Sequence, residues 1–284
     1  MTAALLEFDR DEFREAFDRR SFAIRHQLSE HSALSLECLC ELAARWPQHR
    51  VEYNRGDVPV SIDYEATPGN GLSVEDTIRN IESNRSWMVL KHVQEDPEIG
   101  TLLKRCLTEV GDVLPETSRD MTHRIAFVFV SSPGAVTPFH IDPENNFLLQ
   151  ARGQKTIYTF APDDRIVLSE RQIERFTAGG HRNLELDKAW NERATPFVLR
   201  PGDGVHVPMH APHYVCNGDN VSISLSITFQ TPNSDRRRAT YWANHQLRRL
   251  GLRPKPPGRG GIGEACKHVS FAAARSVARL LRSS

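Results

Sequence analysis

The strongest constraint on the fold is a series of short β-type runs between residues 123 and 232. HRIAFVFVSS, KTIYTFAP, TPFVLRPGDGVHVP, HYVCNG and VSISLSITFQ follow one another closely, with Pro, Gly, Asn or Asp between most of them. Such spacing predicts an antiparallel β-sandwich or barrel. VSISLSITF alternates strictly between apolar and small polar residues. Its polar face suits either the inside of a wet pocket or a solvent-exposed surface.

The first 122 residues have a different pattern, which predicts a mainly helical part packed on the β-rich core. Helical spacing of apolar residues occurs in residues 1–20, 35–46, 73–84 and 97–114. Shorter runs that favour strands occupy residues 21–28, 58–64 and 87–93. Ser73, followed by acidic residues, is the expected N-cap of the third helix.

The last part, residues 233–284, is basic. From Asp235 to Ser284 there are twelve Lys or Arg and two Asp or Glu, although the whole chain has a net charge of zero. Residues 253–263 are rich in Pro and Gly and predict a linker before a final basic helix. We expect these C-terminal helices to pack on the acidic body or on a second subunit, which would make a homodimer. Nucleic acid and anionic lipid are the other candidate partners of a basic tail.

Composition narrows the class of protein. The chain has no run of eighteen apolar residues and its N-terminus lacks a secretory signal pattern, so we expect no transmembrane segment and a cytoplasmic location. Five scattered cysteines without a CxxC pair argue against a disulfide framework. We interpret Cys38 and Cys40 as small core residues. We expect no nucleic-acid partner, because the body has no nucleic-acid-binding motif.

His140 and Asp142 stand two residues apart in the stretch TPFHIDPENNF. In a strand, residues i and i+2 point to the same side, so these side chains are two candidate metal ligands. A third can come from His206 or His213, whereas His210 lies in a PMHAP turn and is expected to be exposed. Two histidines and one carboxylate leave coordination positions open, as in non-haem Fe(II) oxygenases.

The same stretch resembles the core of the JmjC-type, cupin-fold 2-oxoglutarate oxygenases, especially their asparaginyl-hydroxylase-like branch. The residues at that family's offsets are Thr137, His140, Asp142, Asn146, Gln150, Gly153, Lys155, Gly202, Asp203, Pro208 and His213. The resemblance covers roughly residues 123 to 230.

The resemblance implies a double-stranded β-helix (jelly roll) core in residues 123–232, with helices added before and after it. It implies that His140, Asp142 and His213 bind Fe(II), which leaves His206 and His210 without an assigned role. It further implies that Lys155 and Thr137 bind the far carboxylate of 2-oxoglutarate and that Asn146 is a further cosubstrate-binding group. Dioxygen would be the second cosubstrate.

Some positions depart from the family pattern. Ala211 and Pro212 stand where the family often has bulky aromatics, and Thr228 stands where the asparaginyl-hydroxylase branch tends to have Asn. Asparaginyl specificity is therefore not transferred to this chain. Two further interpretations rest on local context. We expect the charged residues Glu144 and Arg152 to be solvated loop residues. We expect Tyr158 and Trp190 to pack in the core rather than to line a substrate channel.

The sequence therefore predicts an Fe(II)- and 2-oxoglutarate-dependent dioxygenase that hydroxylates a small molecule or a peptide or protein side chain. One alternative is a metal-binding cupin with another chemistry. That reading is weakened because simple cupins use His-x-His and a later Glu, whereas this chain has Asp142 and Asn146. The other alternative is a non-catalytic regulatory binding module.

Overall fold

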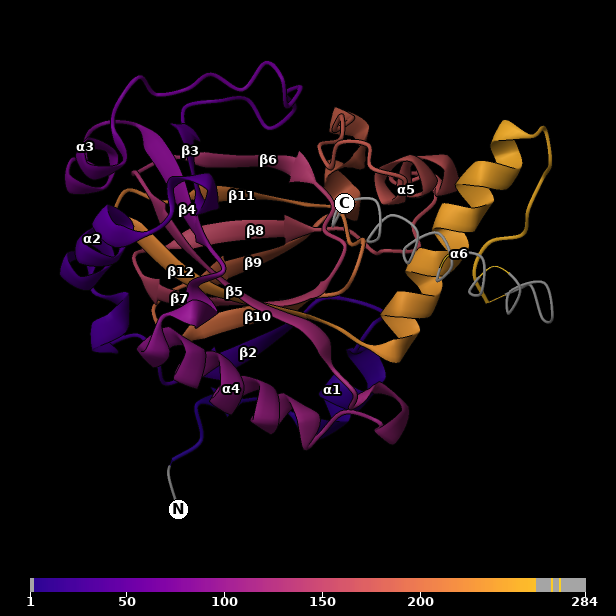
Figure 1. The fold of residues 1–284 in the computed structure, drawn as a ribbon, viewed down its shortest axis with the longest axis horizontal. Helices are drawn as coiled ribbons and strands as arrows, with labels where there is room; N and C mark the ends of the chain where they lie inside the picture. Colours follow the sequence, from indigo (N-terminus) through magenta and orange to yellow (C-terminus); the bar gives the residue numbers. More distant parts are fainter. Residues whose placement is uncertain (1–2, 259–266, 268–270, 272–284) are drawn as a thin grey trace, which may run out of the picture.

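The structure is a computed structural model that describes residues 3–258 together with Lys267 and Phe271. Two antiparallel sheets face each other (Figure 1). The larger sheet contains, in spatial order, β1 (Leu6–Glu7), β2 (Phe22–His26), β10 (Asp203–Val207), β7 (Asn145–Arg152), β12 (Ser222–Gln230), β5 (Thr122–Ser131), β4 (Ser86–Lys91) and β3 (Val51–Arg55). The smaller sheet contains β6 (Val136–His140), β11 (His213–Asn217), β8 (Lys155–Thr159) and β9 (Thr195–Leu199).

The chain moves repeatedly between these sheets from β5 onward. β5, β7, β10 and β12 belong to the larger sheet, and the strands between them belong to the smaller one. This alternation is the topology of a jelly roll. The predicted fold class, mainly β with a double-stranded β-helix core and added helices, is therefore confirmed.

The first four α-helices pack against the outer face of the larger sheet. The α-helices are α1 (Arg10–Ala16), α2 (Leu36–Arg45), α3 (Val74–Arg79), α4 (Pro97–Gly111), α5 (Glu170–Thr177) and α6 (Pro232–Arg249). α4 begins where the Asp96 carboxylate accepts the N–H groups of Glu98 and Ile99, with Pro97 in the first turn. An acceptor before the helix and a proline at its start are a strong N-terminal signal.

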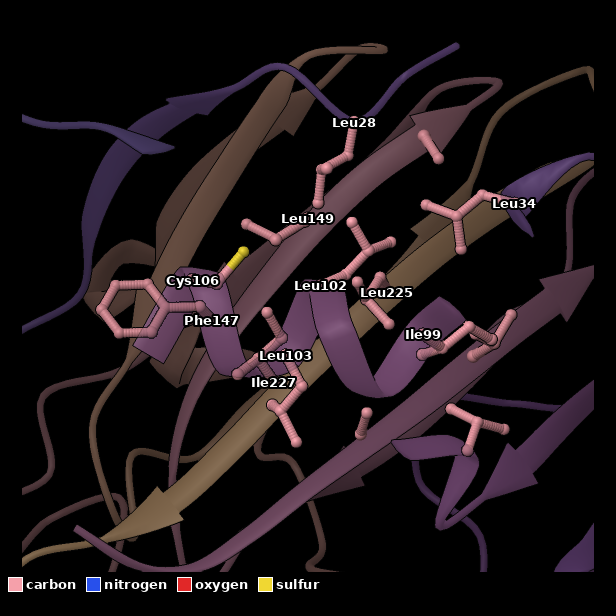
Figure 2. Close-up of a cluster of buried hydrophobic side chains, with 14 of the residues drawn as sticks. Leu28, Leu34, Ile99, Leu102, Leu103, Cys106, Phe147, Leu149, Leu225 and Ile227 are labelled. Carbon is pink, nitrogen blue, oxygen red and sulfur yellow. The ribbon is translucent and has the colours of Figure 1, made fainter. Parts of the chain in front are cut away.

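The main hydrophobic core lies between α4 and this sheet (Figure 2). Side chains of α4, including Leu102 and Cys106, meet alternate residues of β12, Leu225 and Ile227. The intervening residues of β12, Ser224 and Ser226, point to the other face and are also buried. The polar face left open by the sequence is therefore inside the molecule, between the two sheets.

Two segments before residue 123 differ from prediction. Residues 58–64 form no strand, although the Val60 carbonyl accepts one hydrogen bond from the Phe139 N–H at 2.8 Å. Pro59 lacks a backbone donor, which disfavours a continuous ladder. Residues 1–20 hold the short strand β1 as well as α1, and α1 ends before Asp18, whose φ is +63°. The strands expected in residues 21–28 and 87–93 and the helices in 35–46, 73–84 and 97–114 are present, with shifted ends.

α5 and α6 lie together at the end of the sheets where β6 ends (Figure 1). Arg248 of α6 donates to Glu174 of α5 at 2.6 Å, and the Glu174 side chain is buried. Most of the predicted linker and final helix lies outside the described residues. In residues 3–258, every helix is too short or too polar to cross a bilayer.

Candidate functional site

Three potential metal ligands converge at the end of β6. His140 is its last residue, Asp142 follows in the next loop, and His213 begins the neighbouring strand β11, directly opposite His140. The Asp142 Oδ2 atom lies 3.6 Å from His140 Nε2 and 3.5 Å from His213 Nε2. Donor atoms of all three residues lie within 4.8 Å of one another.

Backbone carbonyls orient both imidazoles. His140 Nδ1 lies 2.6 Å from the Pro138 carbonyl oxygen, and His213 Nδ1 lies 2.9 Å from that of Ala211. A carbonyl only accepts, so each Nδ1 carries the proton and each Nε2 presents its lone pair to Asp142. Burial lowers the pKa of His213 to about 4, which keeps its imidazole neutral near pH 7. Neutral imidazoles are the form that binds metals.

Asp142 is held in its ionised form. Burial works to raise its pKa, but the charged neighbours of the carboxylate, the permanent cation Arg182 among them, hold the pKa well below its usual range. The other carboxylate oxygen, Oδ1, accepts from the Arg182 guanidinium at 3.2 Å, and the His210 N–H donates to the Asp142 carbonyl at 3.0 Å. Both interactions fix the carboxylate with Oδ2 facing the two histidines.

These donors fit a divalent first-row metal ion. Ligand atoms about 2.1 Å from a shared ion lie roughly 3 to 3.5 Å apart, so the observed separations need little adjustment. Two imidazole nitrogens and one carboxylate oxygen are the set found in non-haem Fe(II) sites, and they leave positions open for other ligands.

A cavity of about 470 Å³ opens beside this cluster, between the two sheets. Its wall includes the three potential ligands and also Thr137, Asn146 and Lys155. The structure therefore brings all six sequence-predicted site residues to one cavity. Apolar residues complete much of the wall: Phe127, Phe129, Leu148, Ile157 and Val215.

Lys155 is an unusual feature of this cavity. Its side chain is 4% exposed, and burial alone lowers its pKa to about 7, with no charged group of the described chain offsetting the cost. A buried cation without a counterion is costly. Its position in an accessible cavity that Thr137 also lines therefore suits an anionic ligand.

Two hydrogen bonds explain the polar face of β12. Ser226 Oγ bonds Asn146 Oδ1 at 2.8 Å, and Ser224 Oγ bonds Gln150 Oε1 at 2.6 Å. The first bond fixes the Asn146 amide at the cavity wall. The second stabilises the end of β7, where Gln150 Nε2 also donates to the Arg152 carbonyl at 2.6 Å.

Several predicted environments were wrong. His210 is 1% exposed rather than exposed, because α5 and α6 cover it through Phe176 and Tyr241. Glu144 lines the cavity instead of lying in solvent, and its pKa is raised to about 8, first by burial and then by Asp142.

His206 points away from the cavity. Its ring is fully buried on the other face of the sheet, where Phe17 and Phe22 pack against it. His206 therefore does not face the cavity that His213 lines. Of the two histidines that the sequence offered as the third metal ligand, only His213 lies beside His140 and Asp142.

Two cavity residues had no signal in the sequence. Arg182 lies in the irregular segment after α5, and Trp87 lies on β4, outside the jelly-roll strands. Each reaches the cavity only through tertiary packing. Tyr158 and Trp190, in contrast, are half-buried and pack against a separate hydrophobic cluster, and neither lines the cavity.

Comparison with known proteins agrees with this architecture. A family model of the JmjC domain matches residues 105–236. The chain is 29% identical over 105 residues to lysine-specific demethylase 8 of Danio rerio, which covers 34% of this chain and 24% of that protein. It is 29% identical over 124 residues to a Danio rerio HSPB1-associated protein 1 homolog, which covers 40% of this chain and 28% of that protein. The chain thus spans about a quarter of the length of these curated relatives.

Solved structures show the same fold. Escherichia coli YcfD superposes with a TM-score of 0.53 at 18% identity, over 95% of this chain and 68% of that one. The structure of YcfD, a ribosomal oxygenase, in complex with cobalt and 2-oxoglutarate gives a TM-score of 0.53 at 16% identity, over 96% of this chain and 68% of that one. Residues 105–236 thus resemble the JmjC domain, and the sheet topology of the chain is that of the jelly roll that these solved structures share.

Proposed function

We propose that this protein is an Fe(II)- and 2-oxoglutarate-dependent dioxygenase that hydroxylates a small molecule or a peptide or protein side chain. The observation that carries the proposal is one cavity that holds both a His-Asp-His cluster and an unpaired buried lysine. The cluster suits the metal, and the lysine suits the far end of an anionic cosubstrate.

His140, Asp142 and His213 would hold the metal ion. Bound Fe(II), together with 2-oxoglutarate and dioxygen, supplies the oxidising power for hydroxylation. The chain's own contribution is to hold both imidazoles by their Nδ1 atoms and Asp142 by Arg182. This preorganisation leaves all three donor atoms aimed at one point before the metal arrives.

Lys155 and Thr137 would bind the far carboxylate of 2-oxoglutarate. The ammonium donates charge-assisted hydrogen bonds, which are stronger than neutral ones, and the threonine hydroxyl adds another donor. Asn146, whose Oδ1 is bound to Ser226, would present its Nδ2 to the cosubstrate. The apolar wall excludes water and strengthens each of these interactions.

The prime substrate would enter past polar residues near the metal cluster. Glu144, His181 and Tyr64 line this part of the cavity, and the last two stack at 3.8 Å. The relatives include a demethylase and a ribosomal oxygenase, which supports a protein side chain as one substrate class. The cavity residues support small molecules equally, so both classes remain in the proposal.

Anaerobic titration tests the activity. We expect Fe(II) and 2-oxoglutarate to produce a weak visible charge-transfer band with the wild-type protein, and we expect Asp142→Ala to lose it. Arg152→Ala is the matched control, because Arg152 lies exposed at the end of β7, outside the cavity. Metal binding without any 2-oxoglutarate band or turnover would instead favour a cupin with another chemistry.

The remaining sequence predictions on organisation stay proposals. We divide the chain into a helical part (1–122), the jelly-roll core (123–232) and a basic tail (233–284). Strands β1 to β4 of the first part extend both edges of the larger sheet, which supports its packing on the core. Cell fractionation tests the proposed cytoplasmic location. The molar mass of the protein in solution tests the proposed homodimer through the C-terminal helices.

A further inference from the structure

We propose that His210 positions the metal ligand Asp142, and that helix α6 holds His210 in the conformation this requires. The inference rests on the metal site of the proposed function, and it adds a turn and a helix whose contact lies outside the cavity wall. His210 is 1% exposed, and its backbone N–H donates to the Asp142 carbonyl at 3.0 Å. His210 is therefore in direct contact with the loop that carries the carboxylate ligand.

The backbone of His210 has an unfavourable conformation. The Ala211 N–H donates to the Pro208 carbonyl at 3.0 Å, which closes a turn with His210 as its third residue. The φ angle of His210 is +64°, and this position of a turn favours glycine. A residue stays in such a conformation only where its surroundings enforce it. For His210 the backbone is fixed by the bond to Asp142, and the ring is enclosed on the other side.

Packing alone sets the orientation of the His210 ring. The ring meets Phe176 of α5 edge to face, with 6.0 Å between centroids, and it meets Tyr241 of α6 in the same way at 5.5 Å. Both ring nitrogens are fully enclosed and have no hydrogen-bond partner among the described residues. His210 is therefore not a fourth metal ligand. A phenyl ring in its place would make the same packing contacts.

α6 is itself fixed against α5. Arg248 of α6 donates to the buried Glu174 of α5 at 2.6 Å, and Arg165 donates to the Tyr241 hydroxyl at 3.4 Å. Tyr241 is therefore held firmly where it contacts the His210 ring. The contacts run from Tyr241 to the His210 ring and from the His210 N–H to the Asp142 carbonyl. Such a path carries coupling only if changes at its two ends are not additive.

Two substitutions test the role of His210. We would titrate Co(II) into the full-length, metal-free protein and record its visible d–d bands. His210→Gly suits the turn but removes the ring, and we expect it to weaken Co(II) binding about tenfold or more, as for other groups that orient metal ligands. The d–d bands should also differ from those of the wild type at saturation. His210→Phe restores the ring and should bind Co(II) within about twofold of the wild type, with unchanged bands.

Tyr241→Leu tests the contribution of α6. It should weaken Co(II) binding on its own but add little in the His210→Gly background, because both changes break the same contact. Tyr241→Phe keeps the ring and should match the wild type. Tyr53→Leu is the matched control, because Tyr53 is a half-buried tyrosine of β3 that packs against the main core. Its Co(II) affinity should also match the wild type.

The outcomes separate this inference from the proposed function. Wild-type protein that fails to bind Co(II) overturns the metal site itself. Wild-type binding with no loss in His210→Gly, or an equal loss in His210→Phe, overturns the role of the His210 ring. Additive losses in the double variant overturn the role of α6. If Tyr241→Leu does not fold, the ring resonances of the tyrosine-labelled wild type decide. Those of Tyr241 should move when Zn(II) binds and those of Tyr53 should not; an unmoved Tyr241 would count against the inference.

Discussion

Lys155 affects folding and binding in opposite directions. Its pKa is about 7 in the folded protein, against 10.5 for an unperturbed lysine, because burial disfavours the charged form. Between these pH values the unfolded chain binds more protons than the folded one, so wild-type stability rises with pH across this window. We expect Lys155→Met to raise the free energy of unfolding at pH 7 by on the order of 1–4 kcal/mol, with a smaller gain near pH 10.

Urea denaturation of the metal-free proteins at both pH values measures this gain. The same variant should lose 2-oxoglutarate binding. A variant that is less stable than the wild type at pH 7 would show that Lys155 is structurally compensated.

The same titration predicts a pH dependence of cosubstrate affinity. Above pH 7 the empty site holds a neutral amine, so binding the anion requires uptake of a proton. We expect 2-oxoglutarate affinity to fall about tenfold or more between pH 6.5 and pH 8.5. Lys155→Arg stays charged over this range and should flatten the dependence. Calorimetry in buffers of different ionisation enthalpy measures the proton uptake, and its absence in the wild type would contradict the prediction.

At this scale the sequence predicted residues with a local pattern and missed those without one. His140 and Asp142 were predicted as neighbours on one strand, whereas β6 ends at His140 and Asp142 lies in the next loop. Thr137, Asn146, Lys155 and His213 were predicted from the resemblance to the JmjC-type oxygenases. All six line one cavity, while their roles stay predictions. Trp87 and Arg182 reach the cavity from distant segments. His210 is buried because Tyr241 of α6 packs against it. α6 is distant in the sequence, so the residues around His210 could not predict this burial.

The turn between β7 and β8 sets where β8, and hence Lys155, begins. Gly153 has φ +70°, and a Cβ there would lie 2.3 Å from the Val221 carbonyl oxygen. We expect Gly153→Ala to cost on the order of 2–4 kcal/mol of stability and to weaken 2-oxoglutarate binding in the folded fraction. Gly71 has φ +73° with open space around its Cβ position, so Gly71→Ala isolates the cost of the backbone conformation, about 1 kcal/mol. Thermal unfolding compares the two; equal costs would exclude the clash.

Elements were predictable where local signals agreed. α4 combines the Asp96 cap, Pro97 and an apolar face, and it lies where the sequence predicts it. Residues 58–64 have the apolar alternation of a strand, but their one backbone hydrogen bond with a strand runs from the Phe139 N–H to the Val60 carbonyl. β3 (Val51–Arg55) pairs with β4 instead. Pairing is a tertiary property, so alternation alone could not distinguish these two neighbouring segments.

At the scale of the whole molecule, the central strands of the larger sheet have one face for stability and one face for chemistry. The outer faces of β5, β7 and β12 pack in the main core, and their inner faces border the cavity. The helices of the N-terminal part therefore stabilise the fold from the outside, and none of their residues lines the cavity. The exceptions lie outside its helices: β3, β4 and the segment after β3 carry Glu52, Trp87 and Tyr64 to the cavity wall.

Adjacent residues of β12 test this division. Leu225 is fully buried against α4, whereas Ser226 faces the cavity and bonds Asn146. We expect Leu225→Ala to cost on the order of 2–5 kcal/mol of unfolding free energy while the folded fraction keeps its 2-oxoglutarate affinity. Ser226→Ala should cost about 1 kcal/mol or less in stability but weaken 2-oxoglutarate several-fold, because the Asn146 amide loses its fixed orientation. Urea denaturation and calorimetry on both variants make the comparison. If both changes shift stability and affinity in parallel, the two faces of the sheet are coupled and the division fails.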